Sequence, residues 1–360
     1  MKIALIQNNW GIFNPKTAIG IAAVVRDISL GLLAKGHDVT VFASEGSKFP
    51  GVKLQCVGKS LKQLRLHLFH PDSPAAQTAY VQEVIGHLHG FDIIHSHVEH
   101  VLLPFLKDIP IPVVSTIHGA GFFPREQDIF RKYPDGVFVA LSQGAKRALP
   151  YIHFSTVVYN GIRIDETRYY TTPQLPSYLA WMGRFSENKG VIDAIEASKR
   201  ADDVIVLVGF EESGQEKYFT KVKNLADEIK VRLLNIMMGK EKYSFLGNAK
   251  AFLFPIHWEE PFGLVMIEAM ACGTPVIAYN RGSVAEIVKD GVTGFIIDPD
   301  DTERPGKGSW IIKKQGIDGL VEAIKRAGEI DRANCRKHIG EKFTIEKMVE
   351  GYENMYQKII

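Results

Sequence analysis

Short apolar runs alternate with amphipathic stretches along almost the whole chain, and no other feature restricts the fold as much. The run KIALIQ near the start is typical of a buried strand, GIAAVVRDISLGLLAKG of a helix closed by Gly36, and DVTVFAS of the next strand. Because the strands are almost continuously apolar, they indicate parallel sheets with helices on both faces. We therefore predict the α/β class, with doubly wound, Rossmann-like sheets.

Two domains are expected from the length of the chain and from one interruption of the pattern. The chain has 360 residues, which is long for a single core. The polar, proline-containing stretch DETRYYTTPQLPS at residues 165–177 breaks the alternation, which restarts at YLAWMG. We place the two domains at residues 1–168 and 169–344.

Charge and composition argue against several classes of protein. The net charge of +2 gives no indication of nucleic-acid binding. The three cysteines are far apart and odd in number, which suits a reducing compartment. No apolar run is long enough to cross a bilayer, and the N-terminal stretch turns polar too soon for a signal peptide. We expect a cytoplasmic protein, with any membrane contact peripheral and at the inner face.

The stretch EEPFGLVMIE, residues 259–268, places two carboxylates around a glycine turn. A strand is expected before it and a helix from Gly263 onward. The start of that helix, Phe262 to Val265, offers unpaired N–H groups and the positive end of the helix dipole, which favour a phosphate. Ionised Glu260 and Glu268 can only accept hydrogen bonds, so they suit the hydroxyls of a sugar or ribose. The alternative is that the first acid caps the helix and the second is a surface residue.

A second stretch, GRFSENKG, places two cations where a strand meets a helix. Arg184 directly follows the apolar run YLAWMG, and Lys189 lies just before the next helical pattern. Ligands of such sheets gather beyond the carboxyl ends of the strands, and two cations there can neutralise a diphosphate. The alternative is that Lys189 is a solvated residue at the start of the helix.

Together with NGIRID at residues 160–165 and DGVTGFIID, these motifs resemble family 4 of the retaining glycosyltransferases. The resemblance implies the GT-B fold, in which two Rossmann-like domains face a central cleft. It implies that residues 1–168 bind the acceptor and residues 169–344 the nucleotide sugar. It also implies that the last helix, about 345–360, packs back on the first domain.

The resemblance also implies roles for the motif residues. Glu260 matches the acid that holds hydroxyls of the donor sugar, and Glu268 the acid that binds the ribose. Arg184 and Lys189 match the pair that binds the diphosphate. Backbone amides at the helix start contact the sugar and phosphate; the donor-binding residues there are Phe262, Gly263, Leu264 and Val265.

Three further positions acquire a role through the same resemblance. His118, in TIHGAGF, matches a histidine that reaches the donor sugar near the reacting carbon, and it completes the expected catalytic set with Glu260, Arg184 and Lys189. Gly20 matches a glycine of the loop before the first helix, although Ile19 stands where the family has a second glycine. Backbone near Met237 is expected to contact the base of the nucleotide.

The reaction implied is transfer of a hexose from a UDP- or GDP-sugar to a hydroxyl acceptor with retention of configuration. Both motif acids are already assigned to donor hydroxyls, so we find no carboxylate nucleophile for a double displacement and expect front-face transfer. The protein cations neutralise the diphosphate, so no metal and no further cofactor are expected. The acceptor could be a small molecule, a glycan or a lipid-linked sugar.

Other functions stay open at this point. His95 and His97, in HSHVEH, share one strand face and, with His118, could bind zinc in a metal-dependent hydrolase. A GT-B epimerase would consume the nucleotide sugar without an acceptor, and a binding protein would show no turnover. Residues 60–71, SLKQLRLHLFHP, space leucines as in a helix, which would either pack within the first domain or lie on a membrane.

Overall fold

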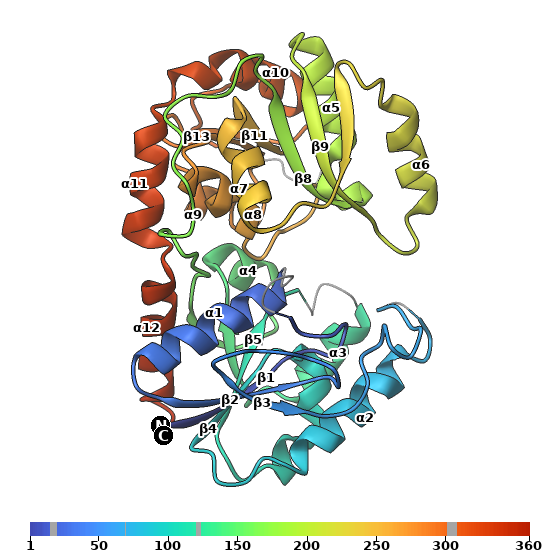
Figure 1. Cartoon of the computed structure of the whole chain (residues 1–360), viewed down its shortest axis with the longest axis vertical. Helices are drawn as coiled ribbons and strands as arrows, with labels where there is room; N and C mark the ends of the chain where they lie inside the picture. The colour runs from blue at the N-terminus through green and yellow to red at the C-terminus, as the bar shows by residue number, and fades with distance from the viewer. Residues whose placement is uncertain (15–19, 69, 120–123, 301–307) are drawn as a thin grey trace. The chain divides into compact units, whose positions relative to one another are not determined.

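The chain forms two α/β units, each built on its own parallel sheet (Figure 1). The structure is a computed structural model and describes residues 1–14, 20–68, 70–119, 124–300 and 308–360. The first unit comprises Met1–Gly161 together with Ile345–Ile360, and the second comprises Ile162–Thr344.

The first unit has a seven-stranded sheet in the order β3-β2-β1-β4-β5-β6-β7, in which every neighbouring pair is parallel. Its strands are β1 Lys2–Ile6, β2 Asp38–Ala43, β3 Lys53–Cys56, β4 Ile93–Ser96, β5 Val113–Ile117, β6 Val137–Ala140 and β7 Phe154–Val157. Its helices are α1 Ile21–Ala34, α2 Ser73–Ile85, η1 Glu99–Asp108, α3 Pro124–Lys132, α4 Gln143–Ala148 and α12 Ile345–Tyr356. The strand order reverses between β1 and β4, where such sheets place their ligands.

The last helix, α12, belongs to the core of this unit. It packs against α1 so closely that a Cβ on Gly31 would lie 2.4 Å from Val349 Cγ2. Tyr352 and Tyr356 on α12 are completely buried. The expectation that the C-terminal helix returns to the first domain thus agrees with the contacts of α12.

The second unit has a six-stranded parallel sheet in the order β10-β9-β8-β11-β12-β13. Its strands are β8 Leu179–Phe185, β9 Ile205–Glu211, β10 Val231–Asn235, β11 Ala251–Phe254, β12 Val276–Tyr279 and β13 Gly294–Ile297. Its helices are η2 Glu187–Lys189, α5 Val191–Arg200, α6 Glu216–Leu225, α7 Gly239–Asn248, α8 Leu264–Ala271, α9 Val284–Ile287, α10 Gly316–Arg326, η3 Ala327–Glu329 and α11 Arg332–Lys342. Here the order reverses between β8 and β11, and both strands lead into the cation and carboxylate motifs.

The second unit begins at Ile162, rather than at residue 169 as the sequence suggested. The backbone N–H of Ile162 donates to the carbonyl of Phe343 at 3.0 Å. Arg336, on α11, donates to the carbonyls of Ile164 and Thr167 at 2.7 and 2.9 Å. These bonds join residues 162–167 to α11 and to Phe343, the residue that follows it, and the polar stretch 165–177 used to place the boundary begins inside this segment.

The expected helix over residues 60–71 is wrong, because the described residues of this segment form turns. Arg65 has a backbone φ of 58°, which a helix does not allow, and Ser60 bonds locally to Gln63. Leu61 is buried, whereas Leu64 and Leu68 are exposed. Leucine spacing alone therefore misled the interpretation, and an interfacial helix here is excluded.

Among the residues that the structure describes, no helix is both long and apolar enough to span a membrane.

Candidate functional site

A glycine turn precedes helix α8. Gly263, the N-cap residue, has φ 78° and ψ 65°, in the left-handed region. This backbone conformation favours glycine, and a Cβ there would also require Met266 Cε, 2.7 Å away, to shift. Leu264 and Val265 are the first helical residues, and their N–H groups have no acceptor within the helix. The turn thus presents two donors and the positive end of the helix dipole, a suitable site for an anion.

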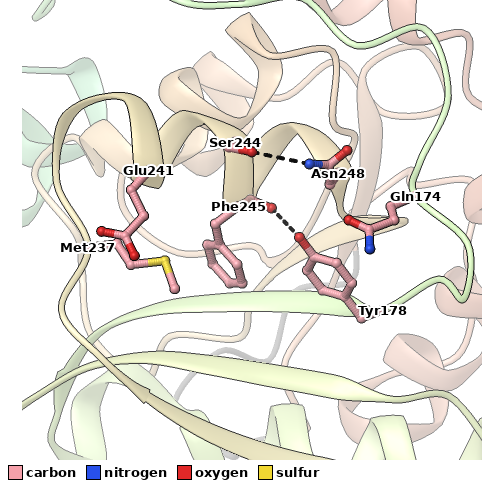
Figure 2. A pocket seen from close by; sticks show the side chains of 7 residues that line it. All are labelled: Gln174, Tyr178, Met237, Glu241, Ser244, Phe245 and Asn248. Carbon is pink, nitrogen blue, oxygen red and sulfur yellow. Dashed lines mark hydrogen bonds between the residues drawn. The ribbon is translucent and has the colours of Figure 1, made fainter.

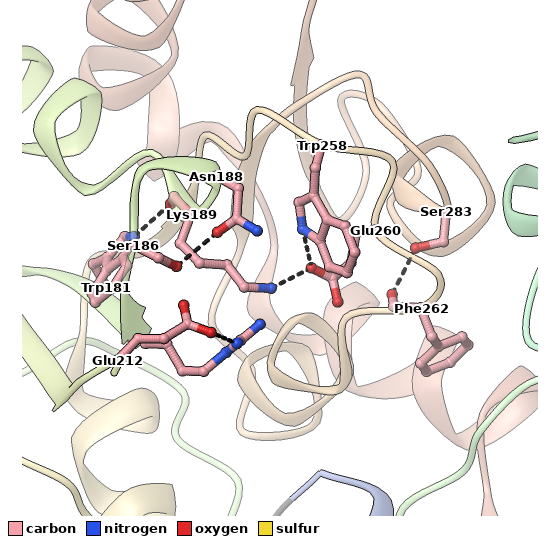
Figure 3. A network of polar contacts seen from close by, with 10 residues as sticks. Trp181, Ser186, Asn188, Lys189, Glu212, Trp258, Glu260, Phe262 and Ser283 are labelled. Atoms are coloured by element: carbon pink, nitrogen blue, oxygen red, sulfur yellow. Dashed lines mark hydrogen bonds and ion pairs between the residues drawn. The ribbon is translucent and has the colours of Figure 1, made fainter. Parts of the chain in front are cut away.

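One oxygen of Glu260 accepts hydrogen bonds from two side chains (Figure 3). Lys189 Nζ lies 2.5 Å and Trp258 Nε1 2.8 Å from Glu260 Oε2. Lys189 also lies over the indole ring of Trp258, 4.8 Å from its centroid. The carboxylate therefore does not cap the helix; its orientation is fixed through Oε2, which leaves Oε1 for the hydroxyl of a ligand.

The turn that carries Lys189 is held by short local contacts. The carbonyl of Lys189 accepts a hydrogen bond from Trp181 Nε1 at 3.2 Å. The carbonyl of Asn188 accepts one from the backbone N–H of His257 at 2.9 Å, which ties this turn to the loop after β11. Gly190 has φ 63°, and a Cβ there would lie 1.7 Å from the carbonyl oxygen of Pro255. The approach of these two loops therefore requires glycine at position 190.

Arg184 lies within β8, which ends at Phe185, two residues later than expected from the sequence. Its guanidinium forms an ion pair with Glu212, which follows β9. Burial lowers the pKa of Arg184, and the negative charge of Glu260 opposes this shift, so Arg184 is close enough to sense that carboxylate. Arg184, Lys189 and Glu260 thus belong to one charged cluster at the carboxyl ends of β8 and β11.

Glu268 is paired with a lysine of the neighbouring helix instead of being a free surface residue. Lys242 Nζ, on α7, lies 2.6 Å from Glu268 Oε1. Both side chains are mostly buried, with exposed fractions of 18% and 15%. One oxygen of Glu268 is thereby fixed, and the carboxylate retains acceptor capacity for a hydroxyl.

Met237 lies just before α7 and lines a pocket of about 250 Å³ (Figure 2). The pocket runs along α7; its other lining residues are Gln174, Tyr178, Glu241, Ser244, Phe245 and Asn248. The ring of Tyr178 stacks on Phe245, and its hydroxyl donates to the Phe245 carbonyl at 2.7 Å. Two aromatic rings, one methionine and four polar side chains thus line the pocket.

Phe262 can contribute only backbone to a ligand. Its side chain is buried and packs edge-on against Phe343, and its carbonyl accepts a hydrogen bond from Ser283 Oγ at 2.6 Å. In the first unit, Gly20 is the N-cap of α1 with φ 54°. Ile19 lies outside the described residues.

His118 follows β5 in the first unit and is held by residues that follow β4. Its Nε2 lies 2.9 Å from Nδ1 of His97. Its backbone N–H and that of Gly119 each donate to Oε1 of Glu99 at 2.7 Å. Burial lowers the pKa of His118 to about 3, so its ring is neutral at neutral pH.

The geometry does not support a zinc site on the three histidines. Nδ1 of His95 lies 2.6 Å from Tyr356 Oη, and Nε2 lies 2.7 Å from Thr116 Oγ1, so both ring nitrogens are already bonded. Across the described parts of the chain, no group of three histidine, cysteine, aspartate or glutamate side chains could hold a metal ion. As the strand pattern predicted, the rings of His95 and His97 are adjacent, 4.1 Å apart at their centroids.

The sequence interpretation missed three residues of this site: Glu212, Lys242 and Trp258. Glu212 directly follows β9, so its position after a strand was a signal that could have been used. Trp258 lies two residues before Glu260, directly before the EEPFGLVMIE stretch. Lys242 is one of many lysines on predicted helices, and no local feature of the sequence distinguishes it.

Two family models match consecutive parts of the chain. The model described as Glycosyltransferase Family 4 matches residues 19–166, and the model described as Glycosyl transferases group 1 matches residues 168–309. An uncharacterized glycosyltransferase of Methanocaldococcus jannaschii is 28% identical over 75% of this chain and 76% of its own length. The N-acetyl-alpha-D-glucosaminyl L-malate synthase of Bacillus anthracis is 24% identical over 95% of this chain and 94% of its own.

Solved structures agree in fold. A sucrose-phosphate synthase from Thermosynechococcus elongatus matches with a TM-score of 0.79 at 18% identity, over 99% of this chain and 98% of that one. Anabaena HepE in complex with UDP and glucose matches with a TM-score of 0.75 at 20% identity, over 99% and 100%. The two doubly wound sheets expected from the sequence are thereby confirmed as the GT-B fold. The chain therefore belongs to the family 4 glycosyltransferases and is a glycosyl-transferring enzyme with the GT-B fold.

Proposed function

We propose that this enzyme transfers a hexose from a nucleoside-diphosphate sugar to a hydroxyl acceptor, with retention of configuration and without a metal ion. The observation that carries the proposal is the cluster at the start of α8. There Lys189, Arg184 and the first two amides of α8 lie near the carboxylate of Glu260, whose Oε1 is not used by the bonds to Lys189 and Trp258. A ligand that is anionic in its middle and rich in hydroxyls at both ends matches these groups.

Each part of the donor has a partner in this proposal. The diphosphate binds Arg184, Lys189 and the amides of Leu264 and Val265, since cations and helix N-termini both favour phosphate. A hydroxyl of the sugar donates to Glu260.

On the nucleoside side, the ribose hydroxyls donate to Glu268. The base lies near the backbone around Met237, beside the aromatic residues that line the pocket.

Front-face transfer fits the state of the two motif acids. Glu260 and Glu268 are both ion-paired through one oxygen, which makes either a poor nucleophile for a covalent intermediate. The leaving diphosphate gains charge as the glycosidic bond breaks, and preorganised cations stabilise that charge most. In this mechanism the leaving phosphate accepts the proton of the acceptor hydroxyl on the same face of the sugar.

UDP-hexoses are the first donors to test. HepE, which shares the fold, was solved with UDP-glucose, and two of the relatives are named glycogen synthase and sucrose synthase. GDP-hexoses are tested beside them, because the contact proposed for the base is with backbone near Met237. The acceptor is proposed only as a hydroxyl compound.

Thermal unfolding against a panel of UDP-, GDP- and ADP-sugars tests the proposal. A ligand at about one hundred times its Kd stabilises by about 2.7 kcal/mol, which raises Tm by about 5 to 10 °C for a unit of this size. Glu268→Gln should abolish most of this shift, whereas Glu196→Gln, at an exposed position on α5, should preserve it. If no nucleotide sugar raises Tm, or if both variants respond like the wild type, the assigned site is wrong.

Turnover tests the stereochemistry and the metal independence of the proposed reaction. With the donor found in that panel, the anomeric configuration of the product is read by NMR, and the rate is measured with and without EDTA. Retention and an EDTA-insensitive rate are expected, because the protein supplies the cations. Inversion would contradict front-face transfer, and loss of the rate in EDTA would contradict metal independence.

A further inference from the structure

The HSHVEH motif lies beside His118, and its role is not explained by donor binding. His97 and Glu99 follow β4, and His118 follows the neighbouring strand β5. Glu99 has a backbone φ of 54°, which is uncommon for a residue with a side chain, and it is buried. Its carboxylate accepts the backbone N–H groups of His118 and Gly119. One three-residue segment thus binds both the backbone and the ring of His118.

The ring of His97 has two nitrogens in different situations. Its Nδ1 lies 2.9 Å from His118 Nε2. Its Nε2 is buried and has no hydrogen-bond partner among the described residues. The backbone N–H of His97 donates to the carbonyl of Ile6, and its ring packs on His95, so the ring is fixed in place.

Both imidazoles are neutral, because burial lowers the pKa of His118 to about 3 and that of His97 well below its usual value. Each neutral ring carries one proton, so only two arrangements satisfy the bond between them. If His118 donated, the proton of His97 would lie on its buried Nε2 as a donor without an acceptor. If His97 donates, Nε2 keeps a lone pair instead. Buried N–H groups without a partner are the rarer defect, which favours the second arrangement.

We propose that His97 is a positioning residue for His118: its Nδ1–H donates to His118 Nε2, so that His118 keeps its own proton on Nδ1 and presents an N–H donor to the ligand. His118 then stabilises an oxygen of the donor sugar as a hydrogen-bond donor and is not a general base. This role rests on the proposed function, whereas the position of the proton does not.

The position of the proton can be measured directly in the full chain. With histidine labelled by 15N, long-range 1H–15N spectra distinguish a ring protonated on Nδ1 from one protonated on Nε2, and His118→Gln identifies the signal. We expect His118 to be protonated on Nδ1 at pH 7.5. A proton on Nε2 in the wild type overturns the inference.

Two substitutions of His97 separate positioning from packing. In His97→Asn the side-chain N–H occupies nearly the place of Nδ1–H, whereas His97→Leu fills the space without a donor. We expect kcat/KM for the donor sugar to fall about tenfold or more in His97→Leu, mainly through kcat, and by no more than about threefold in His97→Asn. His153→Asn, at an exposed position in the same unit, should match the wild type.

Each outcome decides one question. An equal loss of kcat/KM in both His97 variants contradicts the positioning role. So does a tautomer of His118 that is unchanged in His97→Leu. If His97→Leu does not fold, the wild-type spectrum still shows which nitrogen of His118 is protonated, and kcat/KM of His97→Asn still tests whether an N–H at this place is sufficient. If the wild type turns over no nucleotide sugar, the proposed function fails, and the spectrum still shows where the proton lies.

Discussion

Acid should destabilise the first unit through its buried histidines. Burial lowers the pKa of His95 and of His118 to about 3 and that of His97 well below its ordinary value of 6.5. In the unfolded chain these rings bind protons below pH 6.5, whereas in the folded chain they do not. Stability is therefore complete above pH 6.5 and is lost as the pH falls from there toward about 3.

The magnitude follows from the difference in bound protons. At pH 5.5 an unfolded histidine of ordinary pKa is stabilised by protonation by about 1.4 kcal/mol. Three such rings lower the free energy of unfolding by about 4 kcal/mol between pH 7.5 and pH 5.5, a large part of the 5–15 kcal/mol typical of proteins. Most carboxylates stay ionised over this range, so histidine dominates the change.

Pulsed proteolysis across a urea series, with peptides of β4 and β5 read by mass spectrometry, measures the stability of this unit in the full chain. His97→Asn removes one of the three rings. Between pH 7.5 and pH 5.5 the free energy of unfolding of this variant should therefore fall by about 1.4 kcal/mol less than that of the wild type. His153→Asn should show the wild-type dependence. If the stability of the wild type does not change between pH 7.5 and pH 5.5, the rings are protonated in the folded chain, and the argument fails.

Two further substitutions test the second unit. Gly190→Ala should lower the free energy of unfolding of this unit by about 3 kcal/mol in urea titrations. The alanine would have to keep a left-handed φ, and its Cβ would meet the carbonyl of Pro255. Gly214→Ala has a positive φ but no atom within 4 Å, so it should lose only about 1 kcal/mol; equal losses would show that the contact is unimportant. Glu212→Gln removes the counter-charge of a guanidinium and should tighten binding of UDP or GDP by about three- to tenfold in calorimetry. Glu211→Gln, an exposed neighbour with the same change of charge, is its control, and equal effects in the two would refute a local role for the ion pair.

The sequence predicted the strands better than it predicted the turns. Apolar runs such as KIALIQ and DVTVFAS became β1 and β2, because a strand buried on both faces is almost continuously apolar. Residues 60–71 carried leucines at helical spacing, but a backbone turned at Arg65 and a local bond between Ser60 and Gln63 decided their conformation. Such side-chain bonds compete with a helix and leave the leucine spacing unchanged.

The sequence indicated which residues follow strands, but it did not indicate which of them pair, because pairing depends on the order of the strands in the sheet. Glu260 and Lys189 lie in turns that local spacing identifies, but their 2.5 Å contact joins residues 71 positions apart. The pairing of Glu268 with Lys242 likewise depends on α7 and α8 lying side by side. Only the folded sheet shows which charges neutralise one another, and hence which oxygen of each acid is left for a ligand.

The return of α12 to the first unit has a consequence for how the chain folds during synthesis. Domains usually fold in the order in which they leave the ribosome. Here the second unit is continuous in sequence, whereas the first lacks α12 until residues 345–356 have been made, after the second unit. Until then, α1 and the buried ring of His95 have no Val349 and no Tyr356 to cover them. The first unit of this enzyme therefore begins to be translated before the second unit and is completed after it.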